Sequence, residues 1–305
     1  MISYFYKGEK QKEELMQLSS KRSGAWICVE SPTQEELEYL QKEFHLEEDL
    51  LHDALDPNEV PRMENEKSGV YVFLQTPSYS KKLVTTTHPV LIILAKHGII
   101  TLSKNHMDFL DIFSQEKKRI QTSQQTRALI EFWFALNKSF TKHLVRIGKE
   151  LRGLSSDVEH IRINDIAKFV EYEKTLSDFL SVLVPMRAIL HRLLSEKSIR
   201  FDEKEKDLME DLFLAMGELI ETSQSSHRHV VNIREASSVI MTHTLNRSIR
   251  TLTILTIVLS IPMILGSLYG MNVNLPFDET SWIFLAIIGT SFIAMGAVFV
   301  FLLRR

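Results

Sequence analysis

The order of polar and apolar positions divides the chain into a long polar part and an apolar C-terminal part. Thr251–Leu268 is a stretch of 18 residues without a charge, and Ser281–Leu303 is a second stretch of 23. A helix rises about 1.5 Å per residue, so roughly 20 apolar residues cross the hydrocarbon core of a bilayer. Each stretch therefore predicts a membrane-spanning helix. Two buried helices of a soluble core are the alternative.

Before these stretches, the first hundred residues mix two periodicities. Short runs rich in β-branched and aromatic residues predict strands at Ala25–Val29, Val70–Thr76, Pro89–Leu94 and Ile99–Leu102. Helical spacing follows the first run, where Thr33 and Glu36 form the pattern of a capping box. Residues 1–104 are therefore expected to form a small α/β domain.

From about Asp108 onward the spacing is helical throughout. Gln125–Leu154 and Ser156–Leu194 each predict a helix, with Pro185 as a candidate kink or break. Asp202–Leu268 contains no proline before Pro262, which predicts one helix that runs from the polar part into the membrane. The fold class is α+β. Its expected parts after the α/β domain are a helical segment at 105–200, a long stalk helix that continues into the first span at 201–268, a link at 269–280, and a second span with a basic tail at 281–305.

Basic residues flank the two spans on the side away from the link. They are Arg247, Arg250, Arg304 and Arg305. The link itself contains Asp278 and Glu279 but no lysine or arginine. Because basic residues favour the cytoplasmic side, both termini and the polar part are predicted to be cytoplasmic. The expected location is the cytoplasmic membrane, with the chain crossing the lipid bilayer twice.

Composition excludes several other classes of protein. The net charge of −3 and the absence of a dense basic stripe argue against a nucleic-acid partner. The single cysteine, Cys28, allows no intrachain disulfide and is expected in the core. No phosphate-binding loop or nucleophile motif is present, so an enzyme is not expected. His227 and His229 are two residues apart and point to different helix faces, which argues against a metal site there.

A polar seam follows one face of the first span. At 100° per residue, one side of the helix carries Asn246, Thr253, Thr256, Ser260 and Ser267. Extended backwards, the same face includes Thr242 and Glu235, with Ile249 on it and Leu252 at its edge. Small polar residues are common where membrane helices pack together. The alternative is a water-lined pore, which two spans can enclose only if several copies form a ring.

The link L-Y-G-M-N-V-N-L-P-F-D-E-T also allows two interpretations. Gly270 and Asn272 are typical of a helix C-terminus and its turn. In a ring of copies, the amide oxygen of Asn272 and backbone carbonyls would instead face a pore mouth. Such neutral oxygens could hold hydrated Mg²⁺ without stripping its water. Asp278 and Glu279 would concentrate cations at the entrance.

These residues together resemble a known family. Tyr-Gly-Met-Asn at 269–272, after the first of two C-terminal spans, resembles the CorA family of divalent-cation channels. Gly24–Leu37 and His88–Leu102 also look like the cytoplasmic domain of that family. The resemblance implies a funnel-shaped homopentamer with a selectivity filter at Gly270, Met271 and Asn272. It also implies Mg²⁺ as the transported ion, with Co²⁺ and Ni²⁺ as further candidates.

The resemblance also implies roles for residues of the stalk helix. Asn246 matches the pore asparagine of the family, Glu235 falls at a pore acid, and Ile249 and Leu252 fall at the apolar gate. Family members close when Mg²⁺ occupies acidic sites between cytoplasmic domains. Candidate regulatory residues are Asp207, Glu210 and Asp211, for which a solvated acidic face is the other interpretation.

The link departs from the family pattern at its acidic positions. Here it reads V-N-L-P-F-D-E, with Asp278 and Glu279 placed late. A zinc-transporting branch often has isoleucine where this chain has Met271. The expected function is Mg²⁺ influx gated by internal Mg²⁺. The alternatives are the same fold carrying Co²⁺, Ni²⁺ or Zn²⁺, and a membrane-anchored scaffold or signalling protein.

Overall fold

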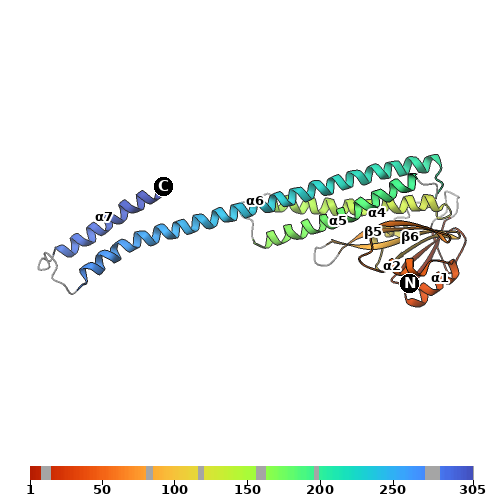
Figure 1. The fold of residues 1–305 in the computed structure, drawn as a ribbon, viewed down its shortest axis with the longest axis horizontal. Coiled ribbons are helices and arrows are strands. Elements are labelled where there is room, and N and C mark those ends of the chain that lie inside the picture. Colours follow the sequence, from red (N-terminus) through yellow and green to blue (C-terminus); the bar gives the residue numbers. More distant parts are fainter. Residues whose placement is uncertain are drawn as a thin grey trace. The chain divides into compact units, whose positions relative to one another are not determined.

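The computed structural model divides the chain into two compact units, Met1–Arg234 and Glu235–Arg305. The longest helix, α6 (Glu203–Tyr269), contributes to both (Figure 1). The residues described are 1–7, 15–79, 85–115, 120–155, 163–195, 199–271 and 282–304.

The first unit is built on a seven-stranded mixed sheet in the order β2-β1-β3-β7-β6-β5-β4. The strands are β1 (Ile2–Tyr6), β2 (Met16–Leu18), β3 (Ala25–Glu30), β4 (Arg62–Glu66), β5 (Gly69–Tyr79), β6 (Thr85–Ala95) and β7 (Gly98–Ser103). Among these described strands, β3 and β7 pair in parallel and every other neighbouring pair is antiparallel. The four predicted strands are therefore confirmed as β3, β5, β6 and β7, while β1, β2 and β4 were not predicted.

Both faces of the sheet are buried, so the middle of its central strands is a continuous apolar run. On β5, Tyr71 and Phe73 belong to one hydrophobic cluster, whereas Val72 and Leu74 belong to the other. Figure 1 shows α1 (Gln34–Phe44) and α2 (Glu48–Asp53) on one side of the sheet and the long helices on the other. The unit thus has a smaller core under α1 and α2 and a larger core under the long helices.

The larger core is formed by helices that follow the sheet along the chain. They are η1 (Asp108–Leu110), α3 (Asp111–Gln115), α4 (Gln125–Ser155), α5 (Ile163–Ser195) and the first part of α6. Pro185 lies inside α5, which continues on both sides of it, so Pro185 does not end the helix. The proline ring removes one amide donor but does not prevent α5 from burying Leu183 and Met186 beside it.

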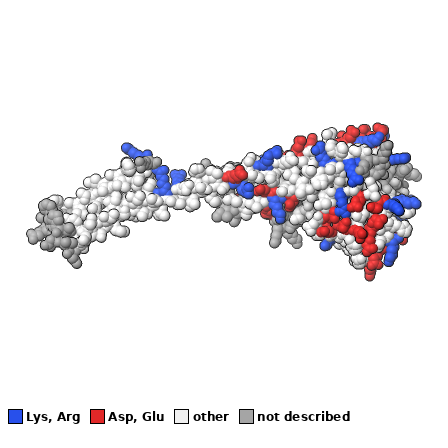
Figure 2. Space-filling model, viewed as in Figure 1, with Lys and Arg blue, Asp and Glu red and all other residues white. Residues whose placement is uncertain are grey.

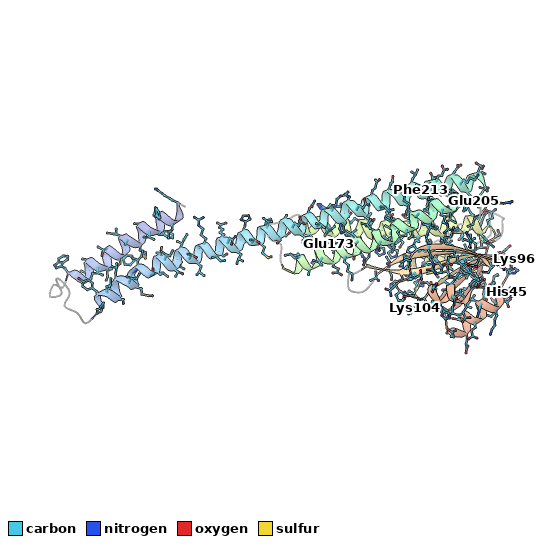
Figure 3. The ribbon with its side chains drawn as sticks, in the orientation of Figure 1. His45, Lys96, Lys104, Glu173, Glu205 and Phe213 are labelled. Atoms are coloured by element: carbon cyan, nitrogen blue, oxygen red, sulfur yellow. The ribbon has the colours of Figure 1, made fainter. Side chains whose placement is uncertain are left out.

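Two helices of this unit begin with reciprocal side-chain caps. At α1 the Glu36 amide donates to Thr33 Oγ1 at 3.3 Å and the Thr33 amide donates to Glu36 Oε2 at 2.9 Å, which confirms the predicted capping box. At α6 the Glu205 amide donates to Asp202 Oδ1 at 2.7 Å, and the Asp202 amide donates to Glu205 Oε2 at 3.0 Å. Thr126 of α4 also donates to Glu205, which is labelled in Figure 3, so this cap joins α6 to α4.

Two glycines allow close approach between neighbouring strands. Gly98 has a φ of +157°, and a Cβ atom there would lie 2.3 Å from the carbonyl oxygen of Ala25 on β3. Gly69 has a φ of +153°, and a Cβ atom there would lie 2.3 Å from the carbonyl oxygen of Leu94 on β6. Both positions accept glycine because it lacks that atom.

The second unit contains the C-terminal part of α6 and α7 (Ile283–Leu303). Both helices are long and apolar enough to cross a membrane. Only 6% of the most apolar window of each is buried inside the chain, unlike the core helices of a soluble protein. Figure 2 shows charged residues spread over the first unit, whereas α7 and the adjoining part of α6 are almost free of them on the visible face.

Candidate functional site: a polar seam and a helix end

One face of α6 in the second unit is covered by α7. Side chains at 241–253 are all exposed, which is the pattern of a helix without a neighbour. From Ile254 onward, reduced exposure recurs at Val258, Ile261 and Leu265, and Val258 is only 7% exposed. This spacing of three and four marks a single stripe. Among the α7 residues whose burial is described, Ser291 is the buried one.

The polar seam lies elsewhere on the helix. Its members are roughly 90° to 170° around α6 from the centre of the stripe that faces α7. Side chains of Asn246, Thr253, Thr256 and Ser267 are exposed, and that of Ser260 is half-buried. Within one chain, therefore, contact with α7 does not account for the seam.

The extension of the seam is exposed as well. Glu235 and Thr242 are exposed, and the apolar Ile249 and Leu252 are 53% and 65% exposed. These predicted pore-lining and gate residues thus lie on an uncovered face of α6. Exposed isoleucine and leucine next to polar residues require either lipid or another copy of the chain to cover them.

Four hydroxyl groups of the seam and its extension donate to backbone carbonyls of α6, three or four residues earlier in the helix. Thr253 Oγ1 donates to the carbonyl of Ile249, and Thr256 Oγ1 donates to that of Leu252, each at 2.9 Å. Thr242 and Ser260 bond in the same way to Ser238 and Ile257. The hydrogen of each hydroxyl is therefore used within the helix, while oxygen lone pairs remain available as acceptors.

At the end of the seam, α6 stops where the sequence predicts. Tyr269 is its last residue, and the Gly270 amide donates to the Gly266 carbonyl at 3.0 Å. The backbone of Gly270 is not left-handed, and the side chain of Met271 is 54% exposed. The remaining predicted residues of the link, Asn272, Asp278 and Glu279, lie outside the described residues.

An arginine connects the two helices of this unit at their other ends. Arg250 Nη2 donates to the carbonyl of Leu302, near the C-terminus of α7, at 3.4 Å. A cation is favourable at the negative end of a helix dipole. Arg250 therefore helps to hold α7 against α6 at the side of the basic residues.

The candidate regulatory acids lie in the first unit. Asp207, Glu210 and Asp211 are all exposed on α6. Among the described residues of one chain, these acids are not part of any group of three ligand atoms within 4.8 Å of one another. This leaves open the predicted role, which requires acids from a second copy.

Sequence reasoning missed a different cluster of metal-ligating side chains. His106, Asp108 and Asp111, at the start of η1 and α3, place one ligand atom each within 4.8 Å of one another. Hydrogen bonds to Glu30 and then to Asp111 raise the pKa of His106 to about 9, against the opposing effect of burial. Glu30 is 76 residues away in the chain, so no local spacing could indicate the contact.

An α/β domain, a long helix that ends in an apolar stretch with an uncovered polar seam, and a second apolar helix are typical of a membrane transport protein. The sequence profile of the family described as CorA-like Mg²⁺ transporter protein matches residues 21–305. The chain therefore belongs to the CorA family. Since members of this family are transporters, the chain is a divalent-cation transporter and not an enzyme.

Individual proteins agree with this assignment. The cobalt/magnesium transport protein CorA of Methanocaldococcus jannaschii is 24% identical over 295 residues, which cover 92% of this chain and 90% of that protein. A mitochondrial inner membrane magnesium transporter of Candida glabrata is 23% identical over 279 residues, covering 81% of this chain and 68% of that protein. The complete structure of the M. jannaschii CorA magnesium transporter matches with a TM-score of 0.84 at 20% identity, covering 100% of this chain and 98% of that one.

Proposed function

We propose that the protein is a channel for Mg²⁺ influx across the cytoplasmic membrane, formed by a ring of five identical chains. The observation that carries the proposal is the polar seam, which lies on the face of α6 that α7 leaves uncovered. The names of the relatives support Mg²⁺ and Co²⁺ as cargo, and Ni²⁺ is a further candidate. The basic flanks of the spans support a cytoplasmic position for both termini and the first unit.

A ring of copies explains why polar residues line one face of a membrane-spanning helix. Two spans cannot enclose a pore, but one seam per chain facing a common axis can line one. The oxygen lone pairs of the exposed Thr253 and Thr256 and of the half-buried Ser260 suit the water hydrogens of a hydrated cation. Asn246 and Ser267 extend this lining. Because Mg²⁺ loses its water shell reluctantly, a lining that accepts hydrogen bonds from that shell favours passage over tight binding.

The two ends of the pore receive different roles. Gly270, Met271 and Asn272 form the selectivity filter at the outer mouth, where Asp278 and Glu279 raise the local cation concentration. Ile249 and Leu252 form the apolar gate, because exposed apolar side chains around a narrow axis exclude water. Glu235 and Thr242 line the cytoplasmic approach.

Internal Mg²⁺ closes the channel in this proposal. Asp207, Glu210 and Asp211 are exposed on α6 and available to acids of a neighbouring copy. A Mg²⁺ ion bound between two copies would hold them in one arrangement. An inside-negative potential favours divalent entry by about 4.6 kcal/mol per 100 mV, so influx needs no ATP.

The test is Mg²⁺ uptake into proteoliposomes with an inside-negative potential, using the native protein and Asn272→Ala. We expect flux in the native protein and its loss in the variant. Asn274→Ala, which changes the other asparagine of the same link, is the matched control and should keep its flux. Competition by external Co²⁺, Ni²⁺ or Zn²⁺ then ranks the ions.

Two results would contradict parts of the proposal. Folded native protein without internal Mg²⁺ that shows no uptake would favour the membrane-anchored scaffold. Equal uptake by all three proteins would keep the channel but remove Asn272 from the filter.

A further inference from the structure

The first unit contains a second group of possible metal ligands, built from residues that the proposed pathway does not use. We define the His106 cluster as His106, Asp108, Asp111 and Glu30. His106 Nε2 lies 3.2 Å from Asp111 Oδ2 and 3.6 Å from Asp108 Oδ1. One imidazole nitrogen thus faces two carboxylates.

These separations suit ligands that share one ion. Zinc-like ions bind histidine nitrogen and carboxylate oxygen at about 2.0 to 2.2 Å, so two ligands at a tetrahedral angle lie about 3.4 Å apart. The two observed distances, 3.2 and 3.6 Å, lie on either side of this value. An ion could therefore replace the hydrogen on Nε2 with little movement of the side chains.

The other ring nitrogen is already held in place. His106 Nδ1 lies 2.9 Å from Glu30 Oε2, and the second oxygen of Glu30 accepts from the Met107 amide at 2.8 Å. In metal sites a ligating histidine almost always donates its second N–H to a carboxylate or carbonyl, which fixes the tautomer. Glu30 takes that position here and leaves Nε2 directed toward Asp108 and Asp111.

The fold fixes the cluster from several elements. Glu30 ends β3, where it pairs in register with Ser103 of β7, and His106 follows β7. The next residue, Met107, is fully buried in the larger core and anchors the segment between β7 and η1. Asp108 and Asp111 then begin η1 and α3. The ligands themselves remain accessible, with 56% of the His106 side chain and 58% of the Asp108 side chain exposed.

We propose that the His106 cluster binds one borderline divalent ion of the Co²⁺, Ni²⁺ or Zn²⁺ class. Imidazole with carboxylates suits these metals, whereas Mg²⁺ prefers oxygen ligands only. His106, Asp108 and Asp111 are the ligands, and Glu30 is the positioning residue. Water completes the open side. The proposal does not depend on which ion the protein transports.

The experiment uses the full chain in detergent after treatment with a chelator. Calorimetric titration with Ni²⁺ measures affinity and stoichiometry, and X-ray absorption of stoichiometrically loaded protein reports the imidazole ligand. We expect His106→Asn to lose one site per chain together with the imidazole signal. Glu30→Gln should keep that signal but weaken affinity about 10- to 100-fold, because it alters only the partner of the ligand.

His229→Asn is the matched control, since it removes an exposed histidine from α6 and should leave the site intact. Equal Ni²⁺ binding by the native protein and His106→Asn would overturn the proposal. So would loss of the site in His229→Asn with retention in His106→Asn. Mg²⁺ uptake by the proteoliposomes is a separate measurement, so failure of the proposed channel leaves the result on the His106 cluster unaffected.

Discussion

At the scale of single residues, the lone thiol is the simplest to interpret. Cys28 lies on β3 and packs against the larger core. Burial, followed by the negative charge of Glu30, raises the pKa of Cys28 to about 12. Since the thiolate is the reactive form, very little of it is present at neutral pH.

We therefore expect Cys28 to react slowly with a thiol reagent in the folded protein. Rapid reaction should follow unfolding in guanidinium, when the thiol regains an ordinary pKa near 8.5. A chromogenic disulfide reagent at pH 7.5 measures both rates on the same sample. Comparable rates before and after unfolding would show that the core around β3 is open.

Local chemistry could be predicted from the sequence, whereas contacts between distant residues could not. Thr33 and Glu36 are three residues apart, so a helix start alone brings their side chains together. Glu30 and His106 come into contact because β3 and β7 pair in parallel. No spacing in the sequence predicts that pairing. The seam could be predicted because it follows one helix. The role of Asn272 remains a prediction.

At the scale of elements, the parallel pair β3 and β7 depends on a glycine. A Cβ atom at Gly98 would lie 2.3 Å from the Ala25 carbonyl oxygen, and its φ of +157° is unfavourable for other residues. We expect Gly98→Ala to destabilise the first unit by about 3 kcal/mol or more. The measurement is the midpoint of thermal unfolding in detergent, monitored by the fluorescence of the buried Trp26 and Trp133.

Gly153→Ala is the control for this substitution. Nothing lies within 4 Å of a Cβ atom at Gly153, which is inside α4, so alanine should be neutral or stabilising by up to about 1 kcal/mol. A midpoint for Gly98→Ala equal to that of the native protein would mean that β3 and β7 can separate without cost.

The strands also show which elements a sequence can reveal. The middle of the central strands β5 and β6, at Tyr71–Leu74 and Val90–Leu94, is buried on both faces and is therefore an unbroken apolar run. The edge strand β4 reads R-M-E-N-E and gives no such signal. Antiparallel pairing with β5 holds β4 in the sheet, and Arg62 adds side-chain contacts. Arg62 pairs with Asp53 at 2.7 Å and with Glu64 at 2.6 Å, and it lies over the Phe73 ring.

At the scale of the whole molecule, the proposed ring of copies can be tested by cross-linking cysteines placed on different faces of α6. In a chain whose Cys28 is replaced by alanine, we expect Thr253→Cys to cross-link neighbouring copies in membranes treated with a bifunctional maleimide. Thr253 lies on the seam, which faces other copies in the proposed ring. Gel electrophoresis of the treated membranes should show a ladder of multiples of the chain.

Val258→Cys supplies the comparison, because Val258 is 7% exposed and lies under α7 of its own chain. It should give little or no ladder. A ladder from Val258→Cys with none from Thr253→Cys would place the seam against lipid. The highest multiple observed for Thr253→Cys tests the number five directly.

The bonding of the seam hydroxyls has a further consequence. Thr242, Thr253, Thr256 and Ser260 all give their hydrogens to their own backbone. In the proposed ring, the wall would therefore present oxygen dipoles of one polarity, with no net charge on these four side chains. These four hydroxyl groups would have no free hydrogen to donate to a chloride ion. Discrimination between cations and anions would thus come from oriented dipoles, and a change of pH would titrate none of these four side chains.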